Sequence, residues 1–139
     1  MSWRRVALTV LDAGVLIGVL DAQDAHHAAT TQALSAAVAR GDALAVPASA
    51  YAEAQVGPAR RGREEMRSLD AFLADLSAEV EPITRQVATR AAQLRAQHGP
   101  RLRLPDALVL ATAIQLRADR ILTTDGGWPR ADVPVELIR

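Results

Sequence analysis

Apolar residues occur in this chain both as short continuous runs and as longer patterns with helical spacing. Val6–Leu11 is a continuous, partly β-branched run, which is typical of a strand buried on both faces. In Arg63–Leu76 the apolar residues recur every three or four positions, which predicts an amphipathic helix. The same criteria predict further strands at Leu44–Val46, around Val80, at Arg120–Thr124 and at Val135–Ile138. They predict further helices at Ala13–Leu20, Asp24–Arg40, Ser49–Val56, Thr84–His98 and Pro105–Ala118, with Gly57-Pro58 expected to end the third.

Strands and helices therefore alternate along the whole chain. This order predicts an α/β fold, a three-layer α/β/α sandwich with a mostly parallel central sheet. With no repeat, linker or low-complexity segment visible, residues 1–139 are expected to form a single domain. Ligands in such folds bind beyond the carboxyl ends of the strands.

The composition limits the class of protein further. Half of the chain is hydrophobic but only 3% is aromatic, so the core is expected to consist of Ala, Leu, Val and Ile. The formal net charge of +0 argues against binding to nucleic acid through bulk charge. The chain has no Cys, which excludes disulfides and Cys-ligated zinc.

The N-terminal segment has some features of an export signal, since Arg4 and Arg5 precede an apolar run. Asp12 interrupts that run after six residues, which is shorter than the usual apolar part of a signal peptide. No segment approaches the roughly 20 apolar residues of a membrane span. We therefore expect a cytoplasmic protein that does not enter a membrane.

Four acidic residues stand where apolar runs begin or end. Asp12 follows the first predicted strand, and Asp125 follows the strand at Arg120–Thr124. Asp106 opens the helix after Pro105, and Glu53 lies on the helix after the second strand. Each has an ordinary explanation as a cap, a first-turn acid, a turn residue or a solvated helix residue. Because charges at the edge of a core are costly, the four together favour a shared metal site.

Such a site suits a hard divalent cation. Mg²⁺ and Mn²⁺ prefer oxygen ligands, and Mg²⁺ usually keeps several waters beside a few carboxylates. A bound ion makes water a better nucleophile and offsets charge on a phosphoryl group. The acids therefore indicate a hydrolase, although periodicity alone brings only Asp12 and Asp125 to one edge of the sheet.

Three motifs make the resemblance to a known family specific. Leu11–Ile17, with sequence LDAGVLI, resembles the first motif of PIN domains, an Asp at the end of the first strand. Leu104–Ala113 is similar to their central Asp-Ala motif, and Ile121–Trp128 resembles their Thr-x-Asp turn. Glu53 stands in the place of the helical Glu between them. The order and spacing resemble those of VapC-type toxins over nearly the whole chain.

The resemblance implies a Mg²⁺- or Mn²⁺-dependent ribonuclease, a homodimer and a small antitoxin that covers the site. It implies that four residues are both catalytic and metal-binding, namely Asp12, Glu53, Asp106 and Asp125. It also implies that Thr123 supplies a supporting hydroxyl. Many members have Ser or Thr where this chain has Gly14, so one hydroxyl near Asp12 is missing.

Arginines and one tryptophan are candidates for contact with RNA. Arg101 and Arg103 lie just before Asp106 and are suited to phosphate contacts, which the acids alone would oppose. A denser cluster, which a solvated helix flank also explains, comprises Arg60, Arg61, Arg63 and Arg67. Trp128 is open to two interpretations, packing beneath its loop or stacking on a base.

Two other classes of protein fit part of the pattern. A noncatalytic PIN-like module that binds RNA or protein is the alternative, with Gly14 in its favour and the complete acid set against it. A phosphatase of the haloacid dehalogenase type also has Asp after its first strand. That class needs a second Asp at position 14 and a later Lys, and this chain has neither.

Overall fold

The computed structural model describes residues 5–139, so Trp3 and Arg4 lie outside the described part. The strands are β1 (Leu8–Leu11), β2 (Ala43–Pro47), β3 (Glu79–Glu81), β4 (Arg120–Thr123) and β5 (Val135–Leu137). The helices are α1 (Ala13–Leu20), α2 (His27–Ala39), α3 (Ala48–Arg61), α4 (Arg63–Asp75), α5 (Arg85–His98) and α6 (Leu104–Gln115), with a 3₁₀ turn, η1, at Gly99–Arg101. The five strands form one parallel sheet in the order β3-β2-β1-β4-β5. The predicted fold class is confirmed.

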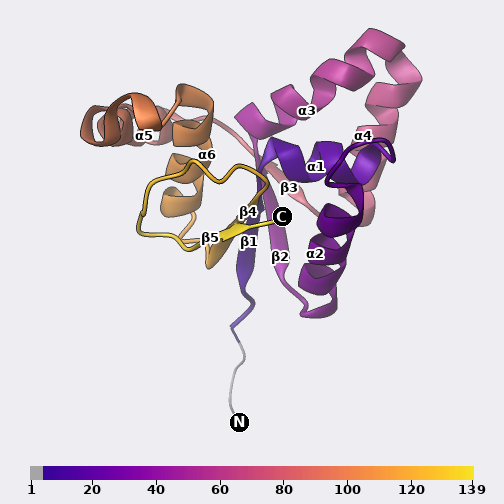
Figure 1. Ribbon diagram of the computed structural model, residues 1–139, viewed down its shortest axis with the longest axis horizontal. Coiled ribbons are helices and arrows are strands. Elements are labelled where there is room, and N and C mark those ends of the chain that lie inside the picture. The colour runs from indigo at the N-terminus through magenta and orange to yellow at the C-terminus, as the bar shows by residue number, and fades with distance from the viewer. Residues whose placement is uncertain (1–4) are drawn as a thin grey trace.

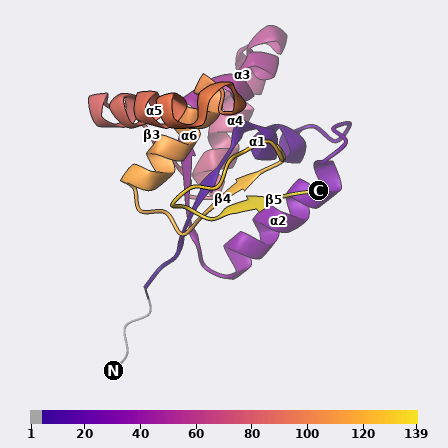
Figure 2. The ribbon, with the colours of Figure 1, turned by 60° about the vertical axis from the view of Figure 1, so that its left-hand side comes forward.

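The strand order reverses at β1, and this reversal decides where the helices lie. The chain first proceeds outward from β1 to β2 and β3, then returns to β4 on the other side of β1. Because parallel crossovers are right-handed, opposite directions place their helices on opposite faces. Accordingly, α1 and α2 lie on one side of the sheet, and α5 and α6 lie on the other (Figures 1 and 2). The carboxyl ends of β1 and β4 meet at this reversal, which is where such folds bind ligands.

The first strand begins later than its apolar run suggests. Val6 is 63% exposed, because pairing with β2 begins only at Leu8 opposite Ala43. The Leu8 amide also donates to the Asp119 carboxylate at 2.7 Å, beyond the end of α6. Similarly, α2 begins after Asp24, whose carboxylate accepts from the His26 amide at 2.8 Å in the preceding loop.

The prediction that Gly57-Pro58 ends the third helix is wrong. The helix α3 continues through both residues, and the Gly62 amide donates to the Pro58 carbonyl at 3.0 Å. A residue before proline normally avoids helical geometry because its Cβ meets the proline ring, and Gly57 has no Cβ. The helix ends instead at Gly62, whose φ of 129° lies in the region that favours glycine.

The core is aliphatic and lies against both faces of the sheet. Its fully buried side chains include Val10 and Leu11 of β1, Ile121 of β4, Leu16 of α1 and Leu110 of α6. The aromatic residues Tyr51, Phe72 and Trp128 are only partly buried and pack against its margin. Within residues 5–139 we find no helix with the length and apolar character needed to cross a bilayer.

Candidate metal centre and active site

Four carboxylates reach one cleft at the carboxyl edge of the sheet. Asp12 follows β1 directly, and Asp125 follows β4 by two residues. Glu53 extends from α3, and Asp106 lies in the first turn of α6. All four line a cavity of about 300 Å³, together with parts of α1. Four segments that are distant in sequence thus bring the four predicted site acids together.

Asp12 is held in place by both neighbouring elements. It is the N-cap of α1, and its Oδ1 accepts from the Ala13 amide at 2.8 Å. Its Oδ2 accepts a hydrogen bond of 2.7 Å from the hydroxyl of Thr123, the last residue of β4. The Thr123 side chain is fully buried. These two hydrogen bonds fix the orientation of the Asp12 carboxylate, whose remaining lone pairs are available in the cleft.

Thr123 also connects Asp12 to Asp125. Its Oγ1 accepts from the Asp125 amide at 3.0 Å while donating to Asp12. The Asp125 carboxylate in turn accepts from the Gly127 amide at 2.9 Å, which closes the turn after β4. The structure thus places the Thr123 hydroxyl between the two strand-end acids.

Burial and repulsion between carboxylates raise the pKa of Asp12, Glu53 and Asp106. Burial is the largest cause of the raised pKa of Asp12, and the bonds from Thr123 and Ala13 partly oppose it. Burial and then the charge of Asp12 raise the pKa of Glu53. The pKa of Asp106 rises from 3.8 to about 6, first through burial and then through the charges of the other three acids. The cleft therefore strongly favours a neutralising cation.

One of the two predicted RNA-contact arginines lines this cleft. Arg103, the residue before α6, lies at the cleft, and its charge lowers the pKa of both Glu53 and Asp106. Arg101 lies in η1 and is not among the cleft residues. The denser arginine cluster lies around the junction of α3 and α4, where Arg61 lines a smaller cavity of about 150 Å³ that Glu53 also borders.

Thr124 is a cleft residue that the sequence analysis did not identify. Its hydroxyl lies beside Gly14, so close that a Cβ at position 14 would come well inside the 3.0 Å limit that real Cβ atoms keep. Both residues line the acidic cleft. The space that a side chain at position 14 would need is therefore taken by a hydroxyl from the neighbouring strand. No short-range sequence pattern could have indicated this, because the two residues are brought together only by pairing of β1 with β4.

The acids fit a hydrated divalent ion better than a fully desolvated one. Among residues 5–139, no three acidic or histidine side chains converge tightly enough to form a ready-made ligand cage. Mg²⁺ does not require one, since it keeps several waters and takes one or two carboxylates. A cleft of about 300 Å³ with four carboxylates has the donors and the space for such an ion.

The parallel sheet is covered by helices on both faces, and the acids lie at its carboxyl edge, where the strand order reverses. These features define an α/β protein with an acidic ligand site. The chain belongs to the PIN domain family, whose model matches residues 9–134. A search of curated proteins gave no match.

Several solved structures share the fold. A toxin–antitoxin complex from Klebsiella pneumoniae has 24% identity and a TM-score of 0.69, covering 84% of this chain and 86% of that one. VapC20 from Mycobacterium tuberculosis, described as a sarcin–ricin loop cleaving toxin, has 18% identity and a TM-score of 0.70, with 85% and 90% covered. VapBC2 from Rickettsia felis, bound to a promoter DNA fragment, has 17% identity and a TM-score of 0.71, with 95% and 99% covered. The fold therefore matches that of VapC toxins in their complexes.

Proposed function

We propose that this protein is a metal-dependent endoribonuclease, the toxin of a toxin–antitoxin pair, with the whole chain acting as one PIN domain. The observation that carries the proposal is the convergence of Asp12, Glu53, Asp106 and Asp125 on one cleft. Burial, and then repulsion from the other three acids, raises the pKa of Asp106 to about 6, which supports the proposal. A carboxylate cluster that is costly without a cation is the arrangement expected of a site built to hold one.

Asp12, Asp106 and Asp125 would hold one or two Mg²⁺ or Mn²⁺ ions, directly or through water, with Glu53 as the fourth ligand or the residue that orients the attacking water. When bound, the metal would activate water and offset phosphoryl charge. Thr123 keeps the Asp12 carboxylate facing the cleft through its 2.7 Å hydrogen bond. The α6 N-terminus at Asp106 adds a positive dipole end to the same cleft.

Two further side chains would act on the substrate side of the cleft. Arg103 would contact a phosphate of the RNA, because its guanidinium borders the acids and carries the opposite charge. Thr124 would supply the hydroxyl that Gly14 cannot. The Thr124 Oγ1 atom lies beside Gly14, where the side chain of a larger residue at position 14 would lie. With Thr124 in this role, Gly14 no longer favours a noncatalytic module.

The proposed partners are a cognate antitoxin and a second copy of the chain. Support for the antitoxin comes from the solved structures of similar fold, which are described as toxin–antitoxin complexes or as VapBC assemblies. An antitoxin that covers the acidic cleft would keep the nuclease inactive until it is removed. An RNA substrate would place the activity in the cytoplasm.

The proposal is tested by incubating the purified chain with total RNA in Mg²⁺, Mn²⁺ or EDTA and mapping the new RNA ends. We expect cuts at defined positions with either metal and none in EDTA. Asp106→Asn should abolish cleavage, whereas Asp75→Asn, a change of an exposed acid at the end of α4, should not. Equal cleavage by the parent and a folded Asp106→Asn protein would refute the site, and no cleavage by any protein would favour the noncatalytic module.

A further inference from the structure

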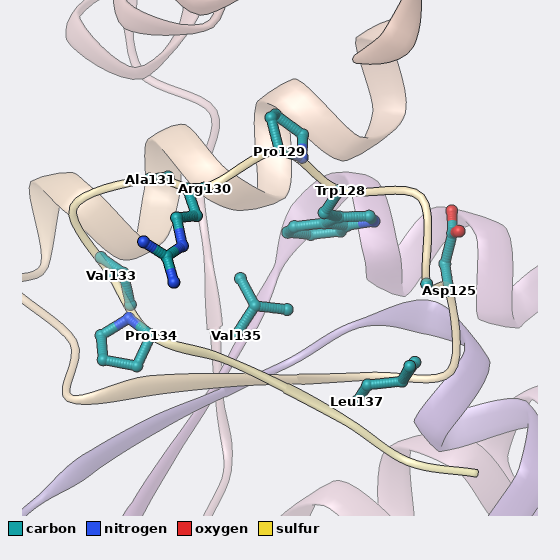
Figure 3. A pocket seen from close by; sticks show the side chains of 10 residues that line it. Asp125, Trp128, Pro129, Arg130, Ala131, Val133, Pro134, Val135 and Leu137 are labelled. Carbon is teal, nitrogen blue, oxygen red and sulfur yellow. The ribbon is translucent and has the colours of Figure 1, made fainter.

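A second cavity lies directly beside the acidic cleft. It has a volume of about 440 Å³ and is formed by the loop between β4 and β5 and by β5 itself. Asp125 lines both this cavity and the cleft. Figure 3 shows Asp125 at one end of the cavity and Trp128 next to it on the loop. A molecule in the cavity would therefore extend toward the metal-binding carboxylates.

The cavity has the surfaces that a flat aromatic ring requires. In Figure 3 the indole of Trp128 lies flat above Val135, with its nitrogen-bearing edge toward Asp125. Val133, Pro134 and Leu137 supply further apolar wall. Ligand pockets of this volume typically combine such apolar walls with a few polar groups that set orientation.

Two polar groups at the cavity have no partner among the residues that the structure describes. The Trp128 Nε1 atom is buried and has no hydrogen-bond partner within residues 5–139. Buried donors of this kind are rare, because an unpaired N–H loses its hydrogen bonds to water. Arg130 is exposed and points toward Pro134 in Figure 3, and it forms no salt bridge with any described residue. The exposed Arg130 guanidinium is thus available to an acidic ligand in the cavity, while the buried Trp128 Nε1 leaves the indole without a polar contact that fixes its position.

We propose that this cavity, the Trp128 pocket, binds the nucleobase of an RNA nucleotide adjacent to the cut phosphate. The base stacks on the Trp128 indole, and Arg130 contacts the phosphate of that nucleotide. Unpaired bases stack on aromatic side chains, and guanidinium groups pair with phosphates. The boundary position of Asp125 joins the base pocket to the acid cleft. This inference rests on the proposed function for its substrate class, but binding can be measured without cleavage.

The test uses the full-length chain with Trp3→Phe, which leaves Trp128 as its only tryptophan. Short single-stranded RNAs are titrated in EDTA, and Trp128 fluorescence and RNA affinity are recorded. Stacking should quench the fluorescence saturably. Replacing one nucleotide at a time by an abasic residue should weaken binding and abolish quenching at one position, a result that needs no protein variant.

Protein variants then test each proposed contact. Trp128→Leu should weaken RNA binding by about tenfold or more, which is the usual loss when one stacked base is removed. Trp128→Phe should retain most of the affinity, and it also serves if the Leu variant does not fold. Arg130→Gln should weaken binding and flatten its salt dependence, whereas Arg90→Gln, on α5 and outside both cavities, should change neither.

The outcomes separate this inference from the proposed function. If the parent cleaves RNA with metal, but RNA neither quenches Trp128 nor binds the variants more weakly, the base pocket is refuted and the nuclease remains. If the parent does not cleave, but quenching and the variant losses occur, the pocket stands and the nuclease is refuted. If Trp128→Leu only lowers the stability, with RNA affinity unchanged, Trp128 is a packing residue and the inference is wrong.

Discussion

The contact between Gly14 and Thr124 allows a double-mutant prediction. Gly14→Ala would place a Cβ well inside 3.0 Å of the Thr124 hydroxyl, while the Thr124 Cβ and Cγ2 would lie at ordinary distances of 3.6 and 3.8 Å. A single atom therefore causes the clash. Relief requires a different Thr124 rotamer or a shift of the strand end, and β-branched side chains resist such rotation. We expect Gly14→Ala to lower the free energy of unfolding by about 1–3 kcal/mol.

In a Thr124→Ala background the same substitution should instead stabilise the protein. The clashing oxygen is gone, and Ala is favoured over Gly within α1 by up to about 1 kcal/mol. The coupling between the two positions should thus be about 2 kcal/mol. Thr124→Val should not relieve the clash, because it keeps a group of similar size. Urea unfolding followed by circular dichroism, in EDTA, measures each corner of the cycle.

Gly18 provides a control in the same helix. Its added Cβ would meet Thr30 Oγ1 at 2.6 Å and Cγ2 at 2.8 Å, so Gly18→Ala should also destabilise. Thr124→Ala should not rescue it, since Thr30 belongs to α2. Additive effects of Gly14→Ala and Thr124→Ala, within about 0.5 kcal/mol, would show that the hydroxyl does not occupy the space beside Gly14.

Two further predictions concern the acids themselves. Because the pKa of Asp106 is raised from 3.8 to about 6, the folded metal-free protein keeps a proton that the unfolded chain has lost between these pH values. The free energy of unfolding should therefore fall as the pH rises through this window. At neutral pH, Asp106→Asn should recover about 1 kcal/mol of it, after allowance for solvent screening. Parallel pH profiles of urea unfolding for the parent and the variant would contradict this. Thr123→Val removes the hydrogen bonds to Asp12 and from the Asp125 amide, so it should cost about 1–3 kcal/mol and weaken Mn²⁺ binding measured by electron paramagnetic resonance. Thr112→Val, at a buried threonine whose hydroxyl bonds only within α6, should leave Mn²⁺ affinity unchanged.

The sheet and its acidic edge could be predicted because they depend on local patterns. Continuous apolar runs define β1 and β4, and parallel pairing then brings the residues after them to one edge. On that ground alone, the sequence predicts that Asp12 and Asp125 lie together. Glu53 and Asp106 lie on helices, and periodicity does not define where a helix begins relative to the sheet edge. Only the order of the motifs along the chain includes these two acids in the site.

What escaped prediction depends on contacts between segments distant in sequence. Thr124 appears unremarkable beside Thr123 in the sequence, yet it takes up the space of a side chain at position 14. The course of α3 through Gly57-Pro58 was missed for a different reason. Glycine and proline each usually end a helix, but glycine before proline removes the clash that makes proline disruptive there. A rule for each residue alone could not describe the pair.

The loop after β4 connects the candidate metal centre to the proposed recognition of a base. The Asp125 amide is held by Thr123, and its carboxylate is oriented by the Gly127 amide, one residue before Trp128. A Cβ at Gly127 would lie 3.3 Å from the Asp125 Oδ1 atom, so a larger residue at this position would crowd the carboxylate. If a base that stacks on Trp128 moves the indole, the adjacent Gly127 amide, which donates to the Asp125 carboxylate, would carry that movement to the acid. The nucleotide beside the cut would then influence catalysis as well as binding, because both depend on the geometry of one short turn.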